Sequence, residues 1–407
     1  MRTGSSKKRL SILVLICVLA ATLAACASDN PDTVPEGPAP DTASVPATPD
    51  DDPTPGDDDT DDDADDTLTI AIITSPNSVD DGAFNENCYG GVLAFLDEHP
   101  EANATPIQEP IIDLSVLAVE EYVEDYDVIV TPSASFAGIG SVALDNPEKY
   151  FILIDVFPRD TEGNTIEVSN IYAVQYKEQD RGFIAGVAAA LETQTGKVAT
   201  VGGMATVPPN VNDQFGFEAG VHYANAHLGT DVEIYSIPAY AGVDGAGNDV
   251  GGNYVGAFDD ADLGKLLAGG LYDAGVDIIF TFAGGSSNGV FGAAMERDNV
   301  YVIGAGVDQF DLGVGNGKSV VLTSVIKMAG VNVKYALDTI ADGSFRGGNN
   351  LLGIETGSVG YVQAPGRHQL SDNTLSVLED VLLLIEDGSI VPPHSGGDST
   401  PTAFPGL

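Results

Sequence analysis

Residues 68–74 read LTIAIIT, and this short apolar run decides the class of fold. It lacks the apolar–polar alternation of a half-exposed strand, which is typical of a strand buried on both faces of a parallel sheet. A polar turn comes next, and apolar residues then recur at i, i+4, i+7 and i+8, which is helical spacing. These residues are Cys88, Val92, Phe95 and Leu96. A strand, a turn and a helix in this order predict the first repeat of an α/β fold.

The same alternation continues along the chain. Apolar runs predict further buried strands at residues 127–131, 151–156, 198–202, 277–282, 300–303 and 320–325. Helical stripes lie between several of them, at residues 183–191 and 263–271. Such alternation predicts parallel sheets covered by helices. The strands are more numerous than one compact sheet takes, so we expect two lobes.

The first residues resemble an export signal. Four basic residues near the start precede an apolar run at residues 10–23, which is too short and wrongly flanked for a membrane span. The run ends in LAAC at residues 23–26, which resembles a bacterial lipobox and predicts cleavage before Cys26 and lipid attachment to its sulfur. The alternative is a plain signal peptide that happens to contain cysteine, as it does at Cys17. The small residues before Cys26 favour the lipoprotein interpretation.

Residues 26–66 form an acidic, proline-rich stretch that we interpret as a disordered tether. From residue 27 onward it holds 15 acidic residues and no basic one, and it has no hydrophobic periodicity. A calcium site is the alternative, but no glycine-turned loop follows the EF-hand pattern. A flexible spacer of this length would hold the body on the order of 40 Å from its anchor.

We expect the following organisation: a signal peptide at 1–25, the tether at 26–66, a first lobe at 67–174 with part of 306–362, a second lobe at 175–305 with C-terminal elements to about residue 392, and a flexible tail at 393–407.

The charge balance is strongly acidic, with 61 Asp and Glu against 16 Lys and Arg and a net charge of −45. Residues 67–407 keep 46 acidic and 12 basic residues, so the body is acidic by itself. This balance excludes a nucleic-acid partner, which needs a basic face. Adaptation to high salt and an ordinary acidic exported protein both remain open.

Catalytic and metal motifs are missing from the sequence. GVGNGKS at residues 313–319 resembles a phosphate-binding loop, but that pattern requires glycine where Leu312 stands, and a predicted strand follows. His222 and His227 lack the zinc-protease spacing, and no Gly-x-Ser-x-Gly elbow occurs. Three cysteines exclude a disulfide framework, and Cys88 is interpreted as packing. We therefore expect no enzyme activity, no cofactor and no metal.

Eight segments, in order, resemble the basic membrane protein family of lipoproteins, whose characterised members include purine-nucleoside receptors of ABC importers. The segments are residues 79–85 (VDDGAFN), 146–155 (NPEKYFILID), 183–198, 201–204 (VGGM), 254–260 (YVGAFDD), 283–289, 306–309 (GVDQ) and 322–327 (LTSVIK). The resemblance covers about residues 68–392. It implies a periplasmic-binding-protein fold of class I, in which two α/β lobes close on a ligand.

The resemblance also implies the site. Phe84 and Phe258 would sandwich a purine, since flat aromatic faces stack on a flat heterocycle. Asp308 would accept hydrogen bonds from the ribose hydroxyls, with Lys327 near the sugar. The remaining contacts would come from Asn85, the backbone around Gly284 and, at the base edge, Asp155.

Two departures from the family leave the base preference open. Ser75 stands where the family commonly has aspartate after the first strand, and Gln309 directly follows Asp308 where a second aspartate is expected. Each site residue also has a structural alternative: both phenylalanines can be packing, and Asp308 and Lys327 can form an ion pair.

The resemblance implies partners as well: a small-molecule ligand, an ABC transporter permease and the membrane, reached through the N-terminal lipid. We expect a monomer, anchored by lipid on the extracytoplasmic face of the cell membrane. The alternatives are a receptor for another small polar ligand such as a sugar, a sensory or surface lipoprotein without an importer, and a hydrolase on a related fold.

Overall fold

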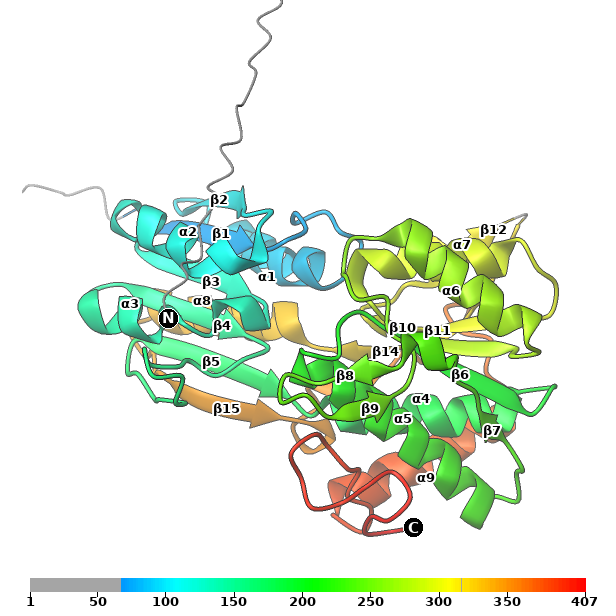
Figure 1. Cartoon of the computed structure of the whole chain (residues 1–407). Coiled ribbons are helices and arrows are strands. Elements are labelled where there is room, and N and C mark those ends of the chain that lie inside the picture. The colour runs from blue at the N-terminus through cyan, green and yellow to red at the C-terminus, as the bar shows by residue number, and fades with distance from the viewer. Residues whose placement is uncertain (1–66, 316) are drawn as a thin grey trace, which may run out of the picture. The chain divides into compact units, whose positions relative to one another are not determined.

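The computed structural model describes residues 67–315 and 317–407. The predicted signal peptide, Cys26 and the tether lie outside these residues. Within them the chain forms two six-stranded sheets flanked by helices, together with two small hairpins (Figure 1). The predicted α/β class with two lobes is confirmed.

The first sheet has the strand order β15-β5-β4-β3-β1-β2, and every pairing in it is parallel. Its strands are β1 (Thr69–Thr74), β2 (Asn103–Gln108), β3 (Val128–Pro132), β4 (Tyr150–Ile154), β5 (Ile171–Tyr176) and β15 (Gly348–Leu352). Its helices are α1 (Phe84–Glu98), α2 (Ser115–Tyr122), α3 (Ile139–Asp145) and α8 (Ala329–Ala341).

The central strand β1 explains why the opening run lacks alternation. Ile70 and Ile72 pack with α1 and α8 on one face, while Ala71 and Ile73 pack with α2 and α3 on the other. All four side chains are fully buried. Cys88 is buried on the α1 face as expected, and burial raises the pKa of its thiol.

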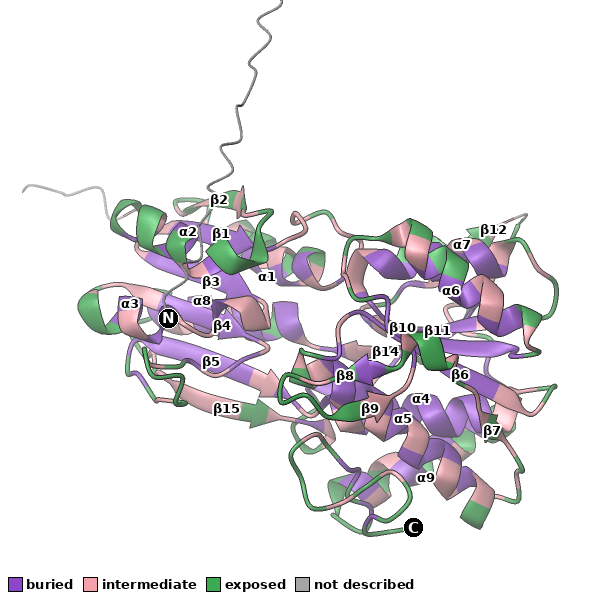
Figure 2. Cartoon of the chain, in the orientation of Figure 1, coloured by how far each residue is buried: buried purple, intermediate pink, exposed green. Residues whose placement is uncertain are grey.

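The second sheet has the order β16-β14-β11-β10-β6-β7, parallel except for the edge strand β16. Its strands are β6 (Lys197–Gly202), β7 (Glu233–Ile234), β10 (Ile278–Phe282), β11 (Tyr301–Gly306), β14 (Val321–Lys327) and β16 (Val359–Tyr361). Its helices are α4 (Glu178–Glu192), α5 (Pro208–His227) and α9 (Asp372–Glu386) on one face, and α6 (Ala261–Asp273) and α7 (Ser287–Met295) on the other. Figure 2 shows the inner strands of both sheets as buried, whereas the edge strands β2, β15 and β7 are partly exposed.

Short elements complete the two lobes. The hairpins are β8 (Gly242–Val243) with β9 (Asp249–Gly251), and β12 (Val314–Gly315) with β13 (Lys318–Ser319). The 3-10 turns are η1 (Ile112–Leu114), η2 (Val123–Asp125), η3 (Ala134–Phe136), η4 (Pro238–Tyr240), η5 (Gly284–Ser286), η6 (Phe310–Gly313) and η7 (Ile354–Thr356). The GVGNGKS stretch falls on the β12–β13 hairpin and leads into strand β14, so it does not open a helix as a phosphate-binding loop would.

Helices α4 and α5 approach each other through glycines. A Cβ atom on Gly186 would lie 2.1 Å from the Phe217 carbonyl oxygen, and one on Gly182 would lie 2.3 Å from the Asp213 carbonyl oxygen. Only glycine tolerates backbone contact this close. The packing fixes the side chains that neighbour these glycines.

The chain passes between the two sheets three times: from β5 to α4, from β14 to α8, and from β15 to β16. The boundary expected after residue 174 falls inside β5, because the pairing with β15 continues to Tyr176. The apolar pattern alone does not indicate that Gln175 and Tyr176 continue the strand.

The C-terminal stretch differs from the expected flexible tail. Phe404 is 7% exposed, and its ring lies 5.7 Å from that of Phe183 on α4. The Ser395 backbone N–H donates to the Asn212 side chain at 2.8 Å. One aromatic anchor and a few hydrogen bonds therefore hold residues that the Gly, Pro and Ser content predicts to be loose.

The acidic body predicts a stability that rises with salt. Screening reduces repulsion between like charges in the compact state, so we expect the melting temperature to increase from low to molar sodium chloride. Choline chloride at equal ionic strength should give a similar rise. A melting temperature that stays flat across the titration would contradict the prediction and weaken the high-salt interpretation.

Candidate functional site

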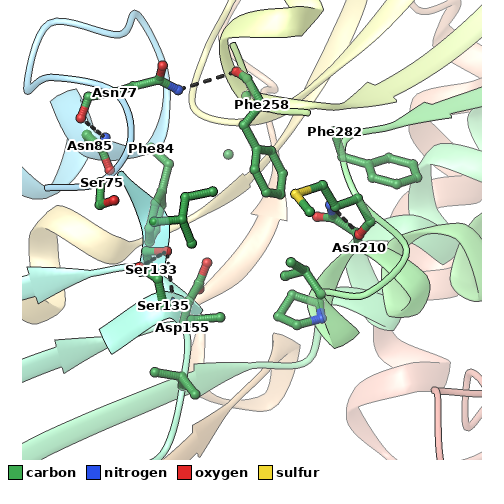
Figure 3. A pocket seen from close by; sticks show the side chains of 18 of the residues that line it. Ser75, Asn77, Phe84, Asn85, Ser133, Ser135, Asp155, Asn210, Phe258 and Phe282 are labelled. Atoms are coloured by element: carbon green, nitrogen blue, oxygen red, sulfur yellow. Dashed lines mark hydrogen bonds between the residues drawn. The ribbon is translucent and has the colours of Figure 1, made fainter. Parts of the chain in front are cut away.

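A cleft of about 510 Å³ lies at the carboxyl ends of strands from both sheets. This volume is within the range of about 300–1,000 Å³ typical of small-molecule sites. Figure 3 shows the cleft from close by, with several of the side chains that line it labelled. The first lobe contributes Ser75, Asn77, Phe84, Asn85, Ser133 and Asp155, the second contributes Met204, Asn210, Phe258, Phe282 and Gly284, and Lys327 lies where the chain crosses between them.

Three polar residues come directly after strands of the first sheet: Ser75 after β1, Ser133 after β3 and Asp155 after β4. The carboxyl ends of parallel strands meet at one edge, which is where α/β sheets bind ligands. Ser133 and Asp155 have φ of 137° and 80°. Non-glycine residues rarely adopt these values, which cluster at functional sites.

Phe84 and Phe258 line the cleft from opposite lobes (Figure 3). Phe84 begins α1 and also packs against the first core, while Phe258 lies in the loop before α6. Gly284 has φ of +56°, and a Cβ there would lie 3.4 Å from Phe258. The Asn77 amide donates to the Phe258 carbonyl at 3.4 Å, which joins the lobes across the cleft.

Lys327 lies at the floor of the cleft. Its ammonium is 5% exposed and donates to Asp155 Oδ1 at 2.5 Å. The same nitrogen lies 3.4 Å from Glu178 Oε1 and 4.3 Å from the centroid of the Phe84 ring. Lys327 therefore joins a carboxylate after β4, a carboxyl on α4 and one of the two aromatic faces.

Asp308 is not brought together with these residues. Asp308 is not one of the described residues that line the cleft. Its carboxylate accepts a hydrogen bond from Arg367 Nε at 2.6 Å. The alternative ion pair between Asp308 and Lys327 is therefore wrong, since each has another partner. The ribose contact of Asp308 stays a prediction, since a carboxylate that accepts from Arg367 can still accept from a ligand hydroxyl.

The predicted residues Asn85 and Ser75 also line the cleft, and they differ from each other in hydrogen bonding. Asn85 is 5% exposed, and its amide nitrogen donates to the Asn77 carbonyl at 2.9 Å, so it shapes the loop before α1. Ser75 is 4% exposed, and its buried hydroxyl has no hydrogen-bond partner among the described residues. Among these residues it is therefore an unpaired polar group in the wall of the cleft.

Sequence reasoning missed Asn77, Ser133, Arg181 and Asn210, which also line the cleft. Ser133 had a usable signal, because it lies just beyond the predicted strand at residues 127–131. Asn77, Arg181 and Asn210 had none, since their positions depend on how the loops and helices pack.

Glu178, the first residue of α4, is 2% exposed. Burial raises the pKa of its carboxyl to about 8, and the nearby Lys327 ammonium offsets part of that rise. The other charged groups around it are Asp155, Arg181 and Asp213.

We expect the folded protein to lose stability as pH rises from about 4.5 to about 8. A carboxyl with a raised folded pKa stabilises the fold fully below its ordinary value of 4.5, and that contribution is lost as pH rises through about 8. The loss should be on the order of a few kcal/mol in urea unfolding. Glu178→Gln should flatten the slope, whereas a slope equal to that of wild type would show that other groups produce it.

Two features are absent from the described residues. No three His, Cys, Asp or Glu side chains there gather as metal ligands would. None of the helices there combines the length and the hydrophobicity that crossing a bilayer requires.

Two α/β lobes with three crossing segments and a cleft give the chain the two-lobed fold of class I solute-binding proteins. The chain belongs to the family described as "ABC transporter substrate-binding protein PnrA-like", whose model matches residues 68–236 and 241–390. It is therefore a substrate-binding protein of an ABC transporter and not an enzyme, and it works on the extracytoplasmic side. The predicted family is confirmed.

Several known proteins are similar to this chain. A "CD4+ T-cell-stimulating antigen" of Listeria monocytogenes is 29% identical over 349 residues, covering 80% of this chain and 88% of the relative. An "ABC transporter nucleoside-binding protein BmpA" of Lactococcus lactis is 27% identical over 350 residues, covering 80% and 89%. A solute-binding protein of Aeropyrum pernix matches in structure with a TM-score of 0.65 and 22% identity, covering 81% and 94%.

Proposed function

We propose that the protein captures a purine nucleoside between its lobes and delivers it to an ABC permease. The observation that carries this proposal is the pair Phe84 and Phe258, which line one cleft from opposite lobes. A planar base fits between two aromatic faces, and the buried polar groups beside them suit a sugar with several hydroxyls. The relative from Lactococcus lactis, whose name states nucleoside binding, supports the same ligand class.

In this assignment the two rings hold the base, and the polar groups around them hold the remaining edges of the ligand. Ser75 offers a buried hydroxyl, and Asp155 and Lys327 offer charged groups at the cleft floor. Asn85 holds the loop that presents Phe84, and Gly284 leaves room beside Phe258.

A thermal-shift screen tests the proposal. A ligand that binds the folded state alone raises the melting temperature, by about 2.7 kcal/mol of added stability at a hundred times its Kd. We expect adenosine, guanosine or inosine to raise it, with ribose, glucose and allose as controls that do not. A shift with a sugar and none with any nucleoside would leave a receptor for another small polar ligand.

We also propose that lipid on Cys26 anchors the protein to the membrane, as the LAAC sequence predicts. Cys26→Ala should abolish labelling by a fatty-acid analogue and move the protein from the membrane fraction to the soluble fraction. Cys17→Ala is the matched control and should change neither. If wild type takes up no label and Cys26→Ala stays with the membrane, the lipid anchor is wrong.

A further inference from the structure

Arg181 lines the cleft from the second lobe and has no role in the site as described so far. It lies in the first turn of α4 and is 4% exposed. Its Nε donates to Asp213 Oδ1 at 2.7 Å, and its Nη2 donates to Asp213 Oδ2 at 2.6 Å. Its third nitrogen, Nη1, is buried and has no hydrogen-bond partner among the described residues.

The packing around Arg181 holds its guanidinium in one orientation. Asp213 on α5 is fully buried, so the forked pair is shielded from water. Gly182 brings α5 so close that a Cβ would lie 2.3 Å from the Asp213 carbonyl oxygen. One edge of the planar group faces Asp213, and Nη1 lies on the side turned away from that carboxylate. A donor held this firmly loses little freedom when it binds an acceptor.

A buried N–H group without an acceptor is costly to the protein, and such groups are uncommon in folded chains. A donor of this kind in the wall of a ligand cleft gains its partner when the ligand binds. An acceptor on the ligand would therefore explain why Nη1 has no hydrogen-bond partner among the described residues.

The charges around Arg181 decide what kind of acceptor fits. Two cations, Arg181 and Lys327, stand among three carboxyl groups, those of Asp155, Glu178 and Asp213. The cluster has no surplus positive charge to balance an anion. An uncharged oxygen, such as a carbonyl or hydroxyl, therefore fits Nη1 better than a phosphate or a carboxylate does.

We propose that Arg181 is a ligand-binding residue that donates from Nη1 to an uncharged oxygen of the ligand, and that Asp213 is the residue that positions it. The inference rests on the proposed nucleoside function and adds to it. On inosine, the carbonyl of the base and the three ribose hydroxyls are the strong uncharged oxygen acceptors, and the ring oxygen is a weaker one. The same charge balance disfavours a nucleotide.

Two variants test the role of Arg181. Arg181→Lys keeps the positive charge beside Asp213 but has no second nitrogen to present to the cleft. Arg181→Leu combined with Asp213→Leu removes both charges together, which avoids leaving one of them buried alone. Each should weaken the binding of inosine by about 10- to 150-fold, the loss expected for a hydrogen bond from a charged donor. Unfolding curves check that both variants fold.

A set of ligands identifies the acceptor by titration calorimetry. Purine riboside lacks the base carbonyl, and 2′-, 3′- and 5′-deoxyinosine each lack one hydroxyl. The analogue that lacks the acceptor should bind wild type about 10- to 150-fold more weakly than inosine does. The two Arg181 variants should bind that analogue as weakly as wild type does, because the contact is already missing. Inosine monophosphate should bind wild type no more tightly than inosine. Arg297→Lys, in an exposed pair with Asp273, is the control and should bind like wild type.

The outcomes separate this inference from the proposed function. If wild type binds inosine and both folded variants bind it equally well, Arg181 contacts no ligand and only the inference falls. Equal further losses with every analogue would mean that the variants disturb the cleft as a whole, which also overturns it. Tighter binding of inosine monophosphate than of inosine would overturn the uncharged acceptor. If wild type binds no nucleoside, the proposed function fails and the inference fails with it.

Discussion

Replacing Lys327 with methionine is expected to destabilise the protein by about 3–5 kcal/mol, because it leaves buried carboxyl groups without their cation. The lysine side chain is 5% exposed, and those of its partners Asp155 and Glu178 are 13% and 2% exposed. The effect should appear in the free energy of unfolding from urea titrations.

A surface lysine provides the control for Lys327. Lys265 pairs with Glu296 at 2.6 Å, but its side chain is 45% exposed, so Lys265→Met should cost no more than about 1 kcal/mol. Adding Asp155→Asn to the Lys327 variant should recover part of the loss, since one of the unpaired charges is then removed. Equal losses for Lys327→Met and Lys265→Met would show that the buried cluster contributes little.

Phe84→Ala and Phe258→Ala should each weaken nucleoside binding by about 1–3 kcal/mol, or about 5- to 150-fold. Each variant removes one aromatic face from the cleft and leaves the other lobe unchanged. Calorimetric titration of the two variants measures the loss.

Phe345→Ala is the control for the two cleft aromatics. Phe345 packs edge-on against Tyr150 at 4.9 Å and is not among the residues that line the cleft. It should bind nucleoside like wild type, although it can lower the melting temperature. If both cleft variants bind as tightly as wild type, the site has been placed wrongly, and Ser75 and Gln309 are the positions to re-examine.

The sequence predicts seven of the twelve strands in the two sheets, because burial on both faces leaves a local trace; it does not predict β2, β5, β7, β15 and β16. Ile70 to Ile73 are all apolar because their alternate side chains enter two different cores. The family resemblance nominates Phe84 and Asp155, and both line the cleft; the structure ends β4 at Ile154, so Asp155 follows the strand instead of lying inside it as expected.

The features that the sequence does not predict all depend on partners distant along the chain. Asp308 pairs with Arg367, which lies 59 residues away. Arg181 reaches the cleft only because glycines bring α4 and α5 together, and Phe404 anchors a stretch that otherwise has the composition of a loose tail. Neither periodicity nor local composition records such pairings.

Titration calorimetry of the wild-type protein with adenosine, guanosine and inosine tests the central claim most directly. The two-lobed cleft predicts saturable heat with at least one of them, at one ligand per protein, together with a rise in melting temperature. The absence of both heat and thermal shift with all three nucleosides would contradict the account.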